Sequence, residues 1–184
     1  MSRKKRPASP GTGADTESMI RVDHAGEYGA VRIYEGQLAV LRRRPGAAAS
    51  VATIEHMAQQ EQAHLKAFDA LVNERRVRPT ALEPVWRIAG FALGAVTAAM
   101  GEKAAYACTA AVEEVIDEHY AGQIAQLGDS DPALTQTVEK FRAEEIEHRD
   151  TALENGAEQA PGYRLLSETI KAGCRMAIRL SERI

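Results

Sequence analysis

Polar and apolar positions follow a helical period through most of this chain. From about Ser18 to Arg44, apolar residues recur at steps of three and four, and Glu27 lies on the same stripe. A second helix is predicted over about 47–76. Its stripe has the spacing of a seam that faces another helix, and consists of Ile54, Met57, Glu61, His64 and Phe68. Two central seam positions therefore hold a carboxylate and an imidazole where leucine is usual.

An uncharged segment follows a break at 77–80. Trp86–Gly101 is the most apolar stretch, and its fourteen residues 88–101 carry no charge. A helix of that length rises about 21 Å, which is less than the hydrocarbon core of about 30 Å. The segment is therefore not predicted to span a membrane. Two interpretations stay open, a core helix and a helix lying at a membrane interface.

Three more helices are predicted towards the C-terminus. They cover about 102–127, about 132–155 with Asp131 as N-cap and Pro132 at the first position, and the chain beyond Pro161. The 132–155 helix has a seam that matches the second helix position for position, and consists of Val138, Phe141, Glu145, His148 and Ala152. The last helix carries a basic ridge with a four-residue step, formed by Lys171, Arg175, Arg179 and Arg183.

The chain contains one pattern twice. Glu27 and Glu113 are each followed by six residues, a tyrosine (Tyr34 and Tyr120), and then a Gly-Gln-aliphatic-Ala segment at 36–39 and 122–125. A Glu-x-x-His motif follows each copy, at 61–64 and 145–148. This arrangement predicts an all-α fold, a four-helix bundle with an internal two-fold repeat and two additional apolar or amphipathic helices.

The repeat identifies a candidate two-metal site. Residues three apart on a helix lie about 60° apart around its axis, so each Glu-x-x-His pair can bind one centre. Four carboxylates would balance the charge of two divalent cations. Oxygen and nitrogen donors that leave positions open suit iron or manganese better than zinc. The candidate ligands are Glu27, Glu61, His64, Glu113, Glu145 and His148.

Other acidic and histidine residues are set aside because the repeat does not match them. This group consists of His24, His56, His119, Glu114, Glu118 and Glu144, the last of which corresponds to Gln60. Glu55 and Glu139 do match each other, but they lie about 120° off the seam and are predicted to be solvated. His24 stays open as a residue that orients a ligand. Tyr34 and Tyr120 are expected to form structural hydrogen bonds rather than a radical.

Composition narrows the class of protein. The 184 residues predict one domain over 18–184, preceded by a disordered basic tail at 1–17. The net charge of -3 argues against general nucleic-acid binding.

Cys108 and Cys174 form no CxxC motif and are interpreted as core residues in a reducing compartment. No apolar segment follows the basic residues 3–6, so no secretory signal is predicted. The tail is either a tolerated flexible terminus or a contact for anionic lipid.

Residues 21–30 (RVDHAGEYGA) resemble the opening signature of the demethoxyubiquinone hydroxylases, the di-iron monooxygenases of ubiquinone biosynthesis. The resemblance covers about residues 19–184. Further matching segments are 77–80, 90–95, 107–109, 112–114, 141–142, 172–175 and 180–183. Every candidate ligand position agrees with the family pattern.

The resemblance implies a ferritin-like bundle that hydroxylates the ring of a polyprenylated demethoxy-benzoquinone with O2. It implies two iron ions per chain, bridged by Glu61 and Glu145, with Glu27 and His64 completing one site and Glu113 and His148 the other. The resemblance implies that two electrons come from outside, from NADH or the reduced quinone. The sequence contains no GxGxxG motif, so it predicts no nucleotide-binding domain. The implied location is peripheral, on the cytoplasmic face of a bacterial cell membrane, with a homo-oligomer and a lipid-binding accessory protein as candidate partners.

Two other functions stay open on the residues alone. A ferroxidase or iron-storage protein would share the metal site but would not act on quinone. A non-enzymatic helical interaction module would bury the same charges without metal. The apolar helix and the basic last helix support a membrane surface, although packing between them or an oligomer contact explains the same features.

Overall fold

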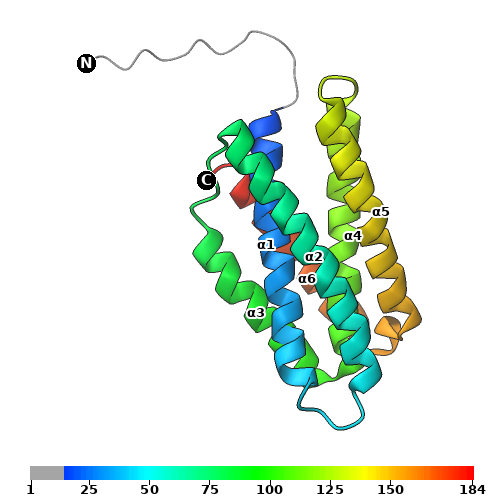
Figure 1. The fold of residues 1–184 in the computed structure, drawn as a ribbon. Helices are drawn as coiled ribbons and strands as arrows, with labels where there is room; N and C mark the ends of the chain where they lie inside the picture. The colour runs from blue at the N-terminus through cyan, green and yellow to red at the C-terminus, as the bar shows by residue number, and fades with distance from the viewer. Residues whose placement is uncertain (1–14) are drawn as a thin grey trace.

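The computed structural model describes residues 15–184, which form six α-helices and one short 3-10 helix without any strand (Figure 1). Their bounds are α1 (Thr16–Leu41), α2 (Ala48–Arg75), α3 (Glu83–Met100), α4 (Glu102–Leu127), α5 (Pro132–Glu154), η1 (Ala157–Gln159) and α6 (Tyr163–Ser181). The predicted all-α fold is confirmed. Residues 1–14 of the predicted basic tail lie outside the described residues.

Capping residues explain where several helices begin. α1 begins at Thr16, two residues before the predicted Ser18, because the Asp15 side chain accepts a hydrogen bond from the Ser18 amide. At α5 the predicted cap is confirmed, since Asp131 accepts from the Leu134 amide and the helix begins at Pro132. α6 begins at Tyr163 instead of Pro161, because the short helix η1 and a turn precede it.

The helices form a four-helix bundle with one side covered. α1 pairs with α2 and α4 pairs with α5, and these two hairpins make the bundle (Figure 1). α3 packs mainly against α1, and α6 packs mainly against α4. One interior therefore lies among the four bundle helices, and a second lies between α1 and α4 and their covering helices. The internal two-fold repeat stays a prediction.

Glycines allow α3 to lie directly on α1. A Cβ atom at Gly94 would overlap the carbonyl oxygen of Ile33, far inside the 3.0 Å below which such contacts are essentially never seen. Gly36 faces the Phe91 carbonyl oxygen in the same way. Because only glycine lacks a Cβ, these positions permit backbone-to-backbone approach. They hold α3 against the helix that carries Glu27.

α3 has a buried face of small residues and an exposed face of large apolar residues. Its small residues Gly90, Gly94, Thr97 and Ala98 are buried. Its large apolar side chains point outwards, with Ile88 70% and Val96 60% exposed. α6 likewise exposes Leu165 and Met176. Among the residues that the structure describes, no helix combines the length and the apolar content needed to cross a membrane.

The predicted basic ridge of α6 is only partly a free surface. Lys171 Nζ lies 2.7 Å from Glu114 Oε2, and Arg175 Nη2 lies 2.9 Å from Glu118 Oε2. These two members of the ridge therefore attach α6 to α4. Their pairing also explains why Glu114 and Glu118 have no counterparts in α1, which is covered by the apolar helix α3 instead.

Candidate metal centre

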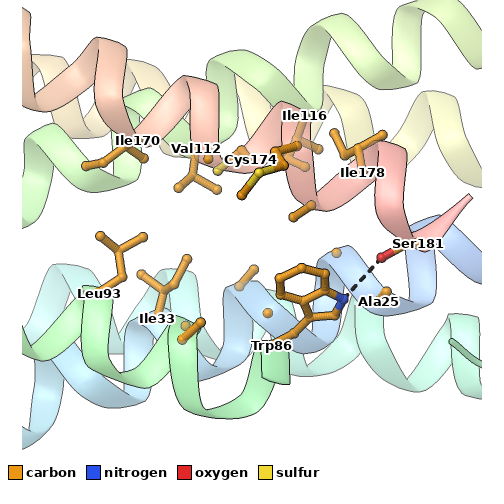
Figure 2. A pocket seen from close by; sticks show the side chains of 18 of the residues that line it. Ala25, Ile33, Trp86, Leu93, Val112, Ile116, Ile170, Cys174, Ile178 and Ser181 are labelled. Atoms are coloured by element: carbon orange, nitrogen blue, oxygen red, sulfur yellow. Dashed lines mark hydrogen bonds between the residues drawn. The ribbon is translucent and has the colours of Figure 1, made fainter. Parts of the chain in front are cut away.

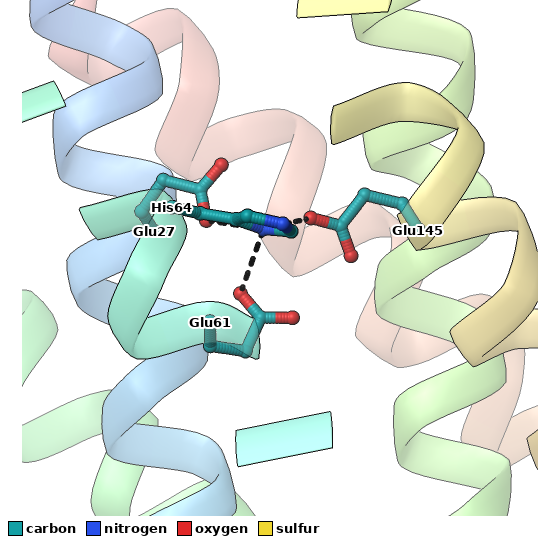
Figure 3. Close-up of side chains that lie close together, drawn as sticks. All are labelled: Glu27, Glu61, His64 and Glu145. Carbon is teal, nitrogen blue, oxygen red and sulfur yellow. Dashed lines mark ion pairs between the residues drawn. The ribbon is translucent and has the colours of Figure 1, made fainter. Parts of the chain in front are cut away.

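All six predicted ligands converge inside the bundle, where each is buried. Ligand atoms of Glu27, Glu61, His64 and Glu145 lie within 4.8 Å of one another (Figure 3). The same is true of Glu61, Glu113, Glu145 and His148. Since Glu61 and Glu145 belong to both groups, the two groups form one continuous cluster. One side chain or pair comes from each bundle helix, as the repeated pattern predicts.

The Nδ1 atoms of both histidines face the carboxylates. His64 Nδ1 lies 3.0 Å from Glu145 Oε1 and 3.6 Å from Glu27 Oε2. His148 Nδ1 lies 3.0 Å from Glu145 Oε2 and 3.1 Å from Glu61 Oε1. Each imidazole thus presents one nitrogen to the same acidic cluster, from opposite helices of the bundle.

Burial and the close approach of several carboxylates shift the pKa values of the clustered residues. Burial raises the pKa of Glu27, Glu61 and Glu113, and the charge of Glu145 adds to the effect. Burial acts on Glu145 in the same direction, but its close contacts with the imidazoles of His148 and His64 outweigh it and lower the Glu145 pKa to about 2. Burial would lower the pKa of His64, whereas contacts with Glu145 and Glu27 raise it to about 11. Bound cations would replace the protons that this arrangement otherwise retains.

Several polar atoms of the cluster have no hydrogen-bond partner in the described part of the chain. They are both carboxylate oxygens of Glu61 and Nδ1 of His64. Each unsatisfied buried polar group costs about 1–3 kcal/mol. A cation would satisfy all three atoms. The residues therefore fit a metal ion, and carboxylate oxygen with imidazole nitrogen suits iron or manganese.

Glu144, which the repeat excluded as a ligand, and its counterpart Gln60 bind the outer nitrogens of the histidines. His64 Nε2 lies 2.6 Å from Glu144 Oε2, and His148 Nε2 lies 3.0 Å from Gln60 Oε1. Glu144 belongs to neither ligand group, so it is an outer partner of a histidine and not a ligand candidate. Both side chains accept hydrogen bonds, and both immediately precede the glutamate of a Glu-x-x-His motif. That shared position is the signal that would have identified them.

The two repeated tyrosines donate hydrogen bonds across the bundle to Glu113 and Glu27, the two glutamates that each belong to only one ligand group. The Tyr34 hydroxyl donates to Glu113 Oε1 at 3.0 Å, and the Tyr120 hydroxyl donates to Glu27 Oε1. Each tyrosine thus contacts the glutamate of the other copy of the pattern. This agrees with the expected structural role.

The remaining candidates bind elsewhere. His24 Nε2 lies 2.9 Å from Asp69 Oδ1, and His119 Nε2 lies 3.1 Å from Asp23 Oδ1. Neither of these bonds involves a predicted ligand. Glu55 forms an ion pair with Arg42 at the surface. The sequence interpretation of Glu55 as solvated therefore holds, and the orienting role left open for His24 has no contact to support it.

An apolar cavity of about 370 Å³ lies beside the cluster, between α1, α3, α4 and α6. Figure 2 shows Ile33, Leu93 and Trp86 on one side of it, and Val112, Ile116 and Ile178 among the residues on the other. A smaller pocket of about 30 Å³ is lined by the four clustered carboxylates. The two spaces share Val22, Gly26, Ala30, Val112, Ile116 and Ile178. A thin apolar wall therefore separates the cavity from the carboxylates.

Comparison with known proteins gives a consistent family. Residues 14–181 match the family described as ubiquinone biosynthesis protein COQ7. A 3-demethoxyubiquinol 3-hydroxylase of Rhodospirillum rubrum is 55% identical, over 97% of this chain and 82% of that protein. The NADPH-dependent 3-demethoxyubiquinone 3-hydroxylase, mitochondrial, of Homo sapiens is 53% identical, over 93% and 79%. The 5-demethoxyubiquinone hydroxylase, mitochondrial, of Saccharomyces cerevisiae is 42% identical, over 91% and 78%.

Proposed function

Because this chain belongs to the ubiquinone biosynthesis protein COQ7 family, we propose that it hydroxylates the ring of a demethoxy-polyprenyl-benzoquinone, as quinone or quinol, with O2. The observation that carries the proposal is the acidic cluster, whose two ligand groups share Glu61 and Glu145 beside an apolar cavity. The names of the relatives support the substrate class. The metal, the electron donor and the membrane contact are further parts of the proposal.

Two iron ions are the proposed cofactor. Glu27 and His64 would hold one, Glu113 and His148 would hold the other, and Glu61 and Glu145 would be shared. Bound there, iron would supply the redox chemistry that activates O2. One oxygen atom enters the ring and the other leaves as water, which requires two electrons and two protons. NADH or the reduced quinone would supply the electrons, and the NADPH-dependent relatives support a nicotinamide donor.

The protein's own residues bind the ring and exclude water. The apolar lining of the cavity suits a substituted benzoquinone with a prenyl tail. Trp86 Nε1 donates to Ser181 Oγ at 3.1 Å, which joins α3 to α6 across one end of the cavity (Figure 2). Tyr34 and Tyr120 keep Glu113 and Glu27 oriented towards the centre. The ring would approach through the wall shared by the two spaces.

A membrane surface is the proposed source of the substrate. Met176 lines the cavity and is 59% exposed, so the cavity lies next to the outward apolar face of α6. α3 exposes Val85 and Ile88 nearby in the fold. These side chains would enter the lipid interface while Arg179 meets anionic head groups. We place the protein on the cytoplasmic face of a bacterial membrane. A second copy of the chain or an accessory protein would compete for the same apolar surface.

Product analysis tests the proposed reaction. The iron-loaded, reduced protein is incubated with a prenylated demethoxyquinone and ¹⁸O-labelled O2. We expect a product that has gained one labelled oxygen atom and retains its prenyl chain. Oxidation of iron without quinone product would instead support a ferroxidase or iron-storage protein. Absence of bound iron would support a non-enzymatic helical module.

Gly26 tests the route from the cavity to the cluster. It lines both spaces, and a Cβ atom added there meets nothing within 4 Å. Gly26→Leu is expected to fill the passage and lower kcat/KM about 10-fold or more, since misplacement by about 1 Å costs up to about 100-fold. Iron content should stay unchanged. Thermal stability should not fall, because leucine favours a helix more than glycine does.

Gly26→Ala is the matched control, because it adds one carbon to the same position. It should retain most of the activity. If Gly26→Leu hydroxylated the prenylated substrate as efficiently as the unmodified protein, the ring would have to reach the cluster by another route.

A further inference from the structure

The two histidines of the cluster have outer partners of different charge. His64 Nε2 lies 2.6 Å from a carboxylate oxygen of Glu144, whereas His148 Nε2 lies 3.0 Å from the amide oxygen of Gln60. Both Nδ1 atoms face the carboxylates. A cation would therefore bind Nδ1 in each case and leave Nε2–H to donate to the outer partner.

The ligands and the tyrosines that contact them are matched between the two halves. Glu61 and Glu145 belong to both ligand groups. The two non-bridging glutamates each accept one tyrosine hydroxyl. Among the groups hydrogen-bonded to the ligands, Glu144 therefore gives the half that contains His64 one additional negative charge. The carboxyl group of Asp23, which also lines the carboxylate pocket, is paired with His119 at 3.1 Å.

The charge of Glu144 is only weakly offset by its surroundings. Lys140 Nζ approaches the other carboxylate oxygen at 3.8 Å, but the Lys140 side chain is 68% exposed. An exposed ion pair of this kind contributes little. The Glu144 side chain is 27% exposed and directs one oxygen at the buried imidazole. Its main fixed partner is thus the histidine.

We propose that the two metal positions are inequivalent, and that Glu144 makes the position at Glu27 and His64 the tighter one and the one that favours ferric iron. The inference rests on the proposed di-iron centre. A hydrogen bond to a carboxylate makes an imidazole a more basic ligand than a hydrogen bond to a neutral amide. The added negative charge also stabilises the more highly charged ion. Glu144 acts through His64 and is a positioning residue.

Two isosteric substitutions test the proposal in opposite directions. Glu144→Gln gives both histidines an amide partner, and Gln60→Glu gives both a carboxylate. Metal-free protein is titrated with Fe(II) under anaerobic conditions in a calorimeter. The unmodified protein should bind in a tight and a weak step. Glu144→Gln should weaken the tight step about 10–100-fold, and Gln60→Glu should strengthen the weak step.

The reduction potential separates a charge effect from structural damage. Glu144→Gln should raise the midpoint potential of the iron centre, because it removes a charge that stabilises ferric iron. Gln60→Glu should lower it. Damage to the fold would not give shifts of opposite sign. The double variant Glu144→Gln, Gln60→Glu should recover two binding steps, with the ⁵⁷Fe Mössbauer signals of the first and second ion exchanged.

Equal affinity at both positions in the unmodified protein would overturn the proposal, and so would a Glu144→Gln protein with unchanged binding steps and potential. Either result in a protein that still forms labelled product would leave the proposed hydroxylase function intact. A protein that binds no Fe(II) would overturn the di-iron centre itself, and the inference with it. Circular dichroism of each metal-free variant provides the control for folding.

Discussion

Glu145→Ala is expected to abolish hydroxylation and most iron binding while the helical fold is retained. Glu145 belongs to both ligand groups, and both histidine Nδ1 atoms lie 3.0 Å from its oxygens. Loss of an outer partner of a metal site typically costs about 10–100-fold. Loss of a shared carboxylate should therefore cost more than about 100-fold in product formation. Alanine favours the helical conformation, so α5 should persist.

Iron content, labelled-product yield and far-ultraviolet circular dichroism measure the three parts of this expectation. Glu147→Ala is the matched control, because Glu147 lies on the exposed side of the same helix. It should bind iron and form product normally. His148→Ala should lose product as Glu145→Ala does. Substantial activity in the Glu145 variant would show that the chemistry occurs somewhere other than this cluster.

Gly94→Ala is expected to destabilise the protein by about 3 kcal/mol, at the upper end of the cost of overpacking a core. The new methyl group would overlap the Ile33 carbonyl oxygen, which belongs to the backbone and has no alternative rotamer. α3 must then move away from α1. For a chain of this size the loss corresponds to a fall of roughly 6–12 °C in melting temperature.

Gly122→Ala is the control for glycine replacement in a helix. Gly122 lies in α4, and a Cβ atom there meets nothing within 4 Å. Alanine should stabilise α4 by about 0.5–1 kcal/mol, because glycine is the poorer helix former. Both variants are compared by thermal and urea unfolding. If both changed stability by the same amount, the contact between α1 and α3 would not be the cause.

The periodic pattern predicted α4 almost to the residue, but it placed several other helix ends two or three residues away from their position in the structure. α3 begins at Glu83, three residues before the predicted Trp86. The prediction followed the apolar stretch of the sequence, and the first turn of the helix lies outside that stretch. α1 begins at Thr16 because of the Asp15 cap. Periodicity reports which face of a helix is buried, whereas helix ends depend on individual capping groups and turns.

The role of Glu144 is not visible when the two copies of the pattern are compared for identical residues. Identity between copies selects side chains that do the same work in both halves. Glu144 and Gln60 occupy the same place but differ in charge, so a search for matching residue types discards them. Their role depends on which histidine each one reaches across the bundle. Each reaches the histidine of the opposite motif, which no spacing within one helix indicates.

The amino-acid sequence was enough to predict the helical fold of the described residues 15–184 and the six side chains that meet in one buried cluster. Both predictions follow from local periodicity, because the residues of an apolar stripe face the core whichever helix packs against them. The sequence did not predict how α3 and α6 cover α1 and α4, where the apolar cavity lies, or which acids pair with the basic residues of α6. Those features depend on contacts between segments far apart in the chain, and many packings of the same helices satisfy one hydrophobic pattern.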